Sequence, residues 1–154
     1  MSVLIKIDIP NLKGLREAFN KSPAVMTKNI NVAVRQTIFF IRGKAVAGAP
    51  ARTGNLRGSA YTSFAPLMGE IGFKAKYAAW VHDGTSPYII EPSNKKALFW
   101  KGASHPVKRV NHPGIRANPF LRRAVDQSQP TVDKFFNKAI QDTLDTIAKG
   151  APDS

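Results

Sequence analysis

Residues 22–48 have the sequence SPAVMTKNINVAVRQTIFFIRGKAVAG, and this stretch predicts a long helix that organises the rest of the chain. Ser22 and Pro23 are typical of a helix start, because serine caps a free amide and proline in the first turn has no amide to lose. Gly48 and Pro50 are typical of its end. Apolar residues at three- and four-residue spacing predict one core-facing stripe: Met26, Ile30, Ala33, Val34, Thr37, Ile38, Ile41 and Ala45.

A second flank of the same helix combines apolar and cationic residues. Its apolar members recur every seven residues, at Val25, Val32, Phe39 and Val46, and cations recur with the same period, at Lys21, Lys28, Arg35 and Arg42. A seven-residue repeat drifts by only about 20° per step on a straight helix, so the row stays on one side. Either the row widens the core stripe, with the cations snorkelling at its edge, or it contacts another subunit. In the second hypothesis the four apolar residues, together with Lys28, Arg35 and Arg42, form a subunit interface, because a helix that is apolar on two sides needs two neighbours.

Short elements are predicted around this helix. Residues 3–9, with the sequence VLIKIDI, alternate as a half-buried strand does, and residues 12–20 fit a short separate helix. Residues 59–64 and 70–73 predict a β-hairpin. Residues 76–82 predict a helical turn, and the Asp-Gly-Thr sequence that follows predicts a tight turn.

The second half of the chain predicts another hairpin and a long loop. Residues 88–90 and 97–100 are expected to pair. Residues 101–118 have no apolar period and exceed the roughly 12–15 residues usual for structureless loops. Ordering each residue costs on the order of 1–2 kcal/mol, and this stretch has few apolar anchors to offset that cost. We therefore expect it to be mobile in the isolated protein and to become ordered against a neighbouring subunit.

The C-terminal third predicts helices. Asn118 and Pro119 repeat the cap-then-proline signal and predict a helix start. Pro130 either kinks this helix or starts a last one. The expected fold class is α+β, with one long N-terminal helix and a C-terminal helix packed on a small antiparallel sheet, and with long loops. The apolar face of the last helix comprises Val132, Phe135, Phe136, Ala139, Ile140, Leu144 and Ile147.

The composition indicates one basic domain. A length of 154 residues is usual for a single domain, so we expect residues 1–154 to form one. Lys and Arg number 23 against 10 Asp and Glu, a net charge of +13, and residues 18–69 and 92–125 contain no carboxylate. This excess either solubilises the surface or binds a polyanion such as DNA through its phosphates. The residues expected to line a DNA passage or to face a partner are Lys101, Lys108, Arg109, Arg116 and Arg122, with Lys95, Lys96 and Arg123 in the same acid-free stretch.

Residues that could carry catalysis show no recognisable arrangement. The sequence has no cysteine, and His82, His105 and His112 lack the spacing of a metal site on a helix. Neither a phosphate-binding glycine loop nor a serine triad can be assembled. We therefore expect no enzyme, no cofactor and no metal. No apolar run approaches the roughly 18 residues of a membrane span, and the start of the chain lacks signal-peptide features, so we expect a product that stays in the cytoplasm or in a structure assembled there.

Three segments resemble the successive signatures of a known virion protein family. They are APARTGNLRGS at residues 49–59, YAAWVHDGT at residues 77–85 and HPGIRANPFLRRA at residues 112–124. Behind a long helix and ahead of a C-terminal one, they look like the bacteriophage neck and tail-completion proteins that include the gene-ten tail component of phage HK-ninety-seven. The resemblance covers about residues 23–148. Where the family's usual pattern has Glu, this chain has His82 and Asp83.

The resemblance implies a structural virion protein without catalytic activity, located in the tail or neck and assembled in the host cytoplasm. It implies a homo-oligomeric ring, a hexamer or dodecamer, at the head-tail junction. Other phage neck and tail proteins would be its partners, with non-specific contact with packaged DNA and no contact with membrane. In this family the three segments would hold the fold, and the positions concerned here are Thr53, Gly54, Leu56, Tyr77, Gly84, Thr85, Pro119 and Phe120.

Two alternatives stand beside this expectation. One is a tail terminator that caps the tail tube, which differs in position along the virion rather than in chemistry. The other is a basic nucleic-acid-binding module, in which Tyr61, Phe64 and Phe73 of the first hairpin would stack on bases.

Overall fold

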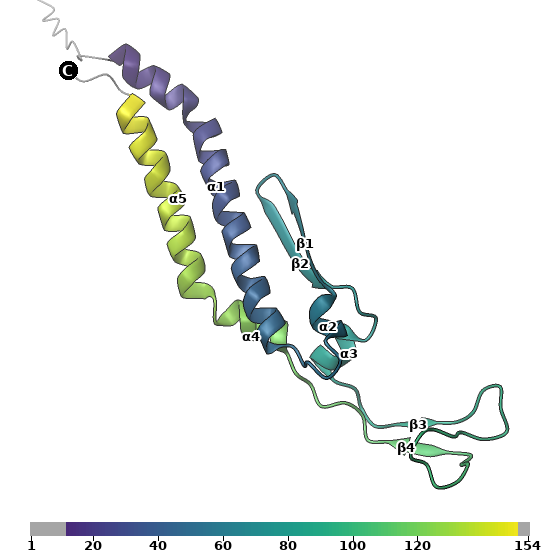
Figure 1. The fold of residues 1–154 in the computed structure, drawn as a ribbon. Helices are drawn as coiled ribbons and strands as arrows, with labels where there is room; N and C mark the ends of the chain where they lie inside the picture. Colours follow the sequence, from purple (N-terminus) through teal and green to yellow (C-terminus); the bar gives the residue numbers. More distant parts are fainter. Residues whose placement is uncertain (1–11, 151–154) are drawn as a thin grey trace, which may run out of the picture.

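The computed structural model describes residues 12–150, with side chains for residues 20–149, so the strand predicted at residues 3–9 lies outside the described residues. Two long helices run side by side, one hairpin lies along the first of them, and a second hairpin extends away from their lower end (Figure 1). The predicted α+β fold is confirmed. In chain order the elements are α1 (Leu12–Gly48), α2 (Asn55–Gly58), β1 (Ala60–Ala65), β2 (Met68–Phe73), α3 (Ala78–Asp83), β3 (Tyr88–Ile90), β4 (Val110–His112), α4 (Phe120–Asp126) and α5 (Gln129–Gly150).

Helix α1 is a single helix, and the prediction of a separate helix over residues 12–20 is wrong. It continues through Pro23 and ends at Gly48, as predicted. Proline cannot donate to the carbonyl four residues earlier, so it bends a helix that packing elsewhere holds together. The first turns of α1 accordingly lie at an angle to the rest (Figure 1). Thr27 Oγ1 donates to the Pro23 carbonyl oxygen at 2.7 Å just beyond the bend.

Helices α1 and α5 pack antiparallel to each other. Asn29 Nδ2 donates to Thr143 Oγ1 at 3.0 Å, and further along the pair the Phe40 and Phe135 rings meet edge to face at 6.0 Å. Pro130 lies in the first turn of α5, so it starts the last helix rather than kinking one. The buried apolar residues of these helices and α4 are mostly alanines: Ala33, Ala45, Ala124 and Ala139, with Ile38, Ile41 and Phe120 as the larger members.

Three residues predicted to lie in the core are exposed instead. Met26 of α1 and Ile140 and Leu144 of α5 each expose about half of their surface. On α5 the contact with α1 is taken by Val132, Ala139 and the buried Thr143, which leaves the edge of the predicted apolar face open. The stripe on α5 is therefore wider than the surface that α1 covers.

The first hairpin, β1 and β2, is confirmed. Its antiparallel register pairs Ala60 with Phe73 and Ala65 with Met68. The hairpin lies along α1 (Figure 1), and the Leu67 amide at its turn donates to Asn31 Oδ1 of α1 at 2.7 Å. Ile71 and Phe73 pack against the buried cluster of Ile41, Ala45 and Ala124, so the hairpin closes the side of α1 that α5 leaves open.

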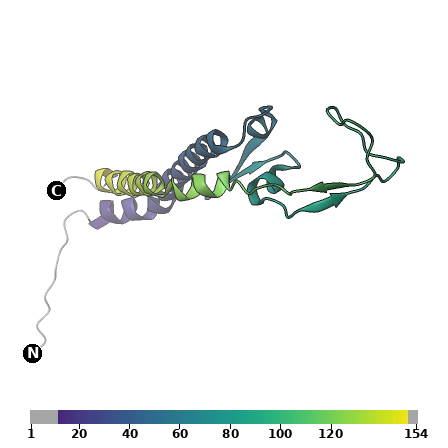
Figure 2. The same cartoon turned by 90° about the horizontal axis from the view of Figure 1, so that it is seen from below.

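The second hairpin differs from the predicted one. Strand β3 pairs with β4, Tyr88 opposite His112 and Ile90 opposite Val110, and not with residues 97–100. The predicted loop over residues 101–118 thus contains a strand, and Leu98 forms a bridge with Val107 inside the hairpin. We call residues 84–118 the arm, because they project from the helical body in both views (Figures 1 and 2).

Candidate functional site

The three sequence segments that carry the family resemblance meet at the end of α1. Leu56 from the first segment and Phe120 from the third form one buried cluster with Ala49, and Ala78 and Val81 from the second segment pack against it. We call this cluster the motif junction. Residues that are separated by up to 71 positions in the sequence therefore share one small core.

The first segment ends α1 and turns the chain. Arg57 donates from Nε to the Ala49 carbonyl oxygen at 2.8 Å and from Nη2 to the Ala47 carbonyl oxygen at 3.0 Å, which satisfies acceptors at the end of the helix. Gly54 precedes α2 in the left-handed conformation, with φ of 75°. Thr53, Leu56 and Tyr77 line one hollow beside this turn.

The second and third segments form the base of the arm. Gly84 has a φ of 78°, and a Cβ placed there would lie 2.6 Å from the Ile115 carbonyl oxygen, so this position needs glycine. The Thr85 amide donates to the same oxygen at 2.9 Å, and the Ile115 amide donates to Thr85 Oγ1 at 3.0 Å. The Asn118 backbone amide donates to the Val81 carbonyl oxygen at 3.0 Å. This hydrogen bond joins the segment that enters the arm to the segment that leaves it.

The start of α4 corrects one expectation. Pro119, not Asn118, occupies the N-cap, and no side chain caps the helix. Asn118 Oδ1 instead accepts a hydrogen bond from Arg123 Nη2. Phe120 follows with only 2% of its surface exposed, and it meets the rings of Phe73 and His82 edge to face at 5.0 and 5.4 Å. The geometry thus gives the motif residues a role in joining the arm to the helical body.

The predicted flank of α1 is only partly covered. Val25 and Val46 are half-buried, whereas Val32 exposes 49% and Phe39 54% of their surface. Phe39 lies 5.4 Å from the ring of Phe64 on the hairpin, and the Arg35 guanidinium lies over that same ring at 4.6 Å. Lys28 and Arg42 are exposed. The flank therefore presents an apolar and cationic surface beside the hairpin.

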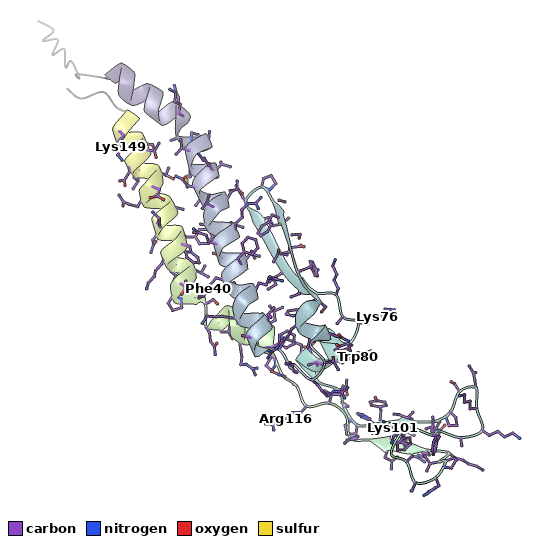
Figure 3. The ribbon with its side chains drawn as sticks, viewed as in Figure 1. Phe40, Lys76, Trp80, Lys101, Arg116 and Lys149 are labelled. Carbon is purple, nitrogen blue, oxygen red and sulfur yellow. The ribbon has the colours of Figure 1, made fainter. Side chains whose placement is uncertain are left out.

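The predicted DNA-facing or partner-facing cations lie mainly on the arm. Lys101, Lys108, Arg109 and Arg116 are exposed there, and Arg122 is exposed on α4. Figure 3 places Lys101 within the arm and Arg116 where the arm joins the body. Among the side chains of residues 20–149, the ion pairs are His82 with Asp83 and Lys138 with Asp142, so these cations have no carboxylate within ion-pair distance.

Large apolar side chains accompany these cations on the arm. Tyr88, Ile89, Phe99 and Trp100 are all exposed, and Phe99 exposes 67% of its surface. A hollow in the arm is lined by Ile90, Leu98, Phe99, Trp100, Val110 and His112. This surface was not predicted from the sequence, because residues 97–100 were expected to pair with residues 88–90 as a strand.

The predicted base-stacking residues do not share a face. Tyr61 is exposed, with Lys74 Nζ 5.7 Å from its ring centre. Phe64 packs on Phe39, and Phe73 packs on the buried Phe120. Phe64 and Phe73 therefore take part in internal packing rather than standing beside Tyr61.

The histidines lie apart. His82 Nδ1 bonds to Asp83 Oδ1, His105 Nδ1 lies 3.0 Å from Ser104 Oγ, and His112 Nδ1 accepts from the Gly114 amide at 3.0 Å. Within the described residues, no three His, Asp or Glu side chains are placed to hold a metal ion, and none of the described helices has an apolar stretch sufficient to cross a bilayer. Comparison with protein-family models, with curated proteins and with solved structures finds no match.

Proposed function

We propose that the chain is a structural virion protein that forms a ring at the head-tail junction of a long-tailed bacteriophage and completes or joins the tail. The observation that carries the proposal is the set of large apolar side chains that the described residues leave exposed. Phe39 of α1, Leu144 of α5 and Phe99 of the arm each expose more than half of their surface. Large exposed apolar side chains on α1, α5 and the arm need neighbours, and a ring supplies them.

The packing of the three resembling segments supports the same proposal. They meet in the motif junction and hold the arm at a fixed place on the helical body. A protein that joins two larger assemblies needs a rigid body for its own ring and a projecting part for the next component. The helical pair and the arm fit these two requirements.

The cations support contact with DNA passing through the ring. Arg122 and Arg123 are neighbours on α4, about 100° apart around the helix, so the two cannot face the same way. Both side chains are exposed, and Arg123 is hydrogen-bonded to Asn118 at the base of the arm. We therefore assign Arg122, with Arg116 at the base of the arm, to phosphate contact that does not depend on base sequence, and the cations further out on the arm to contact with a partner. A virion map with these residues on the outer surface would refute this assignment.

A deletion in the encoding phage tests the proposal. Without the gene, filled heads and separate tails should accumulate, and adding the purified protein should join them. Tails of uncontrolled length would instead identify a tail terminator, because an uncapped tube continues to grow. Virions of normal form would overturn both proposals.

The α1 flank gives the matched variants for this experiment. Phe39→Asp should stay folded and monomeric but fail to restore joining, because it puts a charge into the proposed subunit contact. Leu67→Asp is the control, since Leu67 is equally exposed but lies at the hairpin turn with a φ of 57°, which Asp tolerates. If Phe39→Asp is insoluble even as a monomer, Phe39 belongs to the core and the flank is not an interface.

A further inference from the structure

The arm carries an apolar and cationic surface with no partner in its own copy. Phe99 exposes 67% and Trp100 50% of their surface, and both line the hollow of the arm together with Ile90, Leu98 and Val110. Lys95, Lys96, Lys101, Lys108 and Arg109 are exposed on the same arm, where Glu91 is the one exposed acid outside the carboxylate-free residues 92–118. Contiguous exposed apolar surface of this kind marks an interaction site.

Helix α5 carries a surface of matching character. Asp133, Asn137, Ile140 and Leu144 follow one another at spacings of four, three and four residues, so they form one row along the helix. All four are exposed, Ile140 by 47% and Leu144 by 54%. The row contains a carboxylate and no cation, because Lys134 and Lys138 belong to the adjacent row. We call it the α5 row.

The two surfaces cannot meet within one copy. The arm leaves the body at the end where α5 begins, and α5 runs in the opposite direction (Figures 1 and 2). Leu144 lies 15 residues beyond the start of α5, which is about 22 Å of helix. Contact between arm and α5 row therefore requires a second copy.

We propose that the arm of one copy packs on the α5 row of the next copy, a head-to-tail contact that deepens the proposed ring. The apolar residues of each surface would cover those of the other, and Asp133 would face the cations of the arm. A heterologous contact of this kind closes into a ring when the rotation between copies allows it. The arm, with about 35 residues, is long enough to supply the 20–30 residues per side of a standard interface.

A second copy fits the arm better than nucleic acid does. The hollow beside Phe99 and Trp100 is lined by Ile90, Leu98 and Val110, which have no planar face on which a base could stack, so it needs an apolar partner. The α5 row offers such partners in Ile140 and Leu144, together with a carboxylate. Asp133 then gives the cations of the arm one opposite charge within the contact.

Mixing two defective variants tests the proposal. Phe99→Asp damages the arm and Leu144→Asp damages the α5 row, each at an exposed position, and Leu67→Asp is the matched control. Molar mass in solution is measured by light scattering over a range of concentrations, with circular dichroism as the folding check. Each of the two variants should self-associate at least about tenfold more weakly than the wild-type chain, and the control should not. An equimolar mixture should give a one-to-one dimer, because one intact arm and one intact α5 row remain.

Several results would overturn the inference. They are a wild-type chain that stays monomeric at about 1 mM, equal behaviour of Phe99→Asp and the control, or a mixture that forms no dimer. Trp100→Asp serves as a second arm variant if Phe99→Asp misfolds, because Trp100 is half exposed and lines the same hollow. If Phe99→Asp weakens binding to a DNA duplex and leaves self-association unchanged, the arm is a nucleic-acid surface.

The outcome separates this inference from the proposed function. If the purified protein forms head-to-tail dimers but a phage that lacks the gene makes normal virions, the proposed function is wrong and the contact between copies stands. If tail joining fails without the gene but Phe99→Asp has no effect on self-association, the proposed function stands and the contact between arm and α5 row is wrong.

Discussion

Replacing Phe120 by alanine removes the side chain at which the three motif segments meet. Phe120 is 2% exposed, shares a buried cluster with Ala49 and Leu56, and makes edge-to-face contacts with Phe73 and His82. Truncating a buried Phe costs about 3–5 kcal/mol, a range that includes transfer and cavity effects. Phe120 also loses two aromatic contacts, each contributing about 0.5–1.5 kcal/mol, so the cost of its truncation should lie in the middle of that range or above it. We expect a loss of about 4 kcal/mol, or about 8–16 °C in the melting temperature.

Urea and thermal unfolding, followed by circular dichroism, measure this effect. The protein should be dilute enough to remain monomeric, since association adds its own concentration-dependent stability. Phe99→Ala is the matched control, because it is the same substitution at a side chain that is 67% exposed, and it should change the stability by less than about 0.5 kcal/mol. If Phe120→Ala costs less than about 1 kcal/mol, or no more than the control, the motif junction does not hold the arm to the body and the structural role assigned to it is wrong.

Two further predictions concern the arm. Gly84→Ala should lower the stability by on the order of 1–3 kcal/mol and speed hydrogen exchange at the Thr85 and Ile115 amides, because its Cβ would lie 2.6 Å from a backbone oxygen and its φ is positive. The control Gly58→Ala has free space for a Cβ and should be close to neutral, so equal effects of the two substitutions would contradict the packing at the arm base. Trypsin should cut the isolated protein first at Lys101, Lys108 or Arg109, which are all exposed on the arm, and these sites should be protected in the assembled ring. Equal resistance in both states would mean that contacts within the same subunit hold the arm and that it does not become ordered on assembly.

The long helix and the first hairpin could be predicted from local pattern. The apolar stripe of α1 recurs at helical spacing over residues 22–48, and each turn of such a helix is determined by nearby residues. The hairpin joins strands that are adjacent in the sequence, so its register follows from a short turn. Pro23 was misleading because the signal of a proline in a first turn does not distinguish a new helix from a bend in a longer one.

The local sequence pattern could not predict which strand pairs with β3. Residues 97–100 lie nearer to it in the sequence than β4 does and have the composition of a strand. The partner is chosen at the arm base, where Thr85 and Ile115 exchange backbone hydrogen bonds and so align residues 88–90 with residues 110–112. This alignment depends on Gly84 and on Asn118 being tied to Val81, and these contacts exist only once distant segments have met.

The sequence by itself determined that residues 22–48 and the C-terminal segment are helical, and it contains the basic charge and the three motif segments at residues 49–59, 77–85 and 112–124. Tertiary structure alone decided that those segments share one core, and that Ile140, Leu144, Phe99 and Trp100 stay exposed. The physical reason is that periodicity reports which side of an element is apolar, but not how much of that side a neighbour covers. Here α1 covers only part of the apolar face of α5, and the arm projects beyond the reach of either helix.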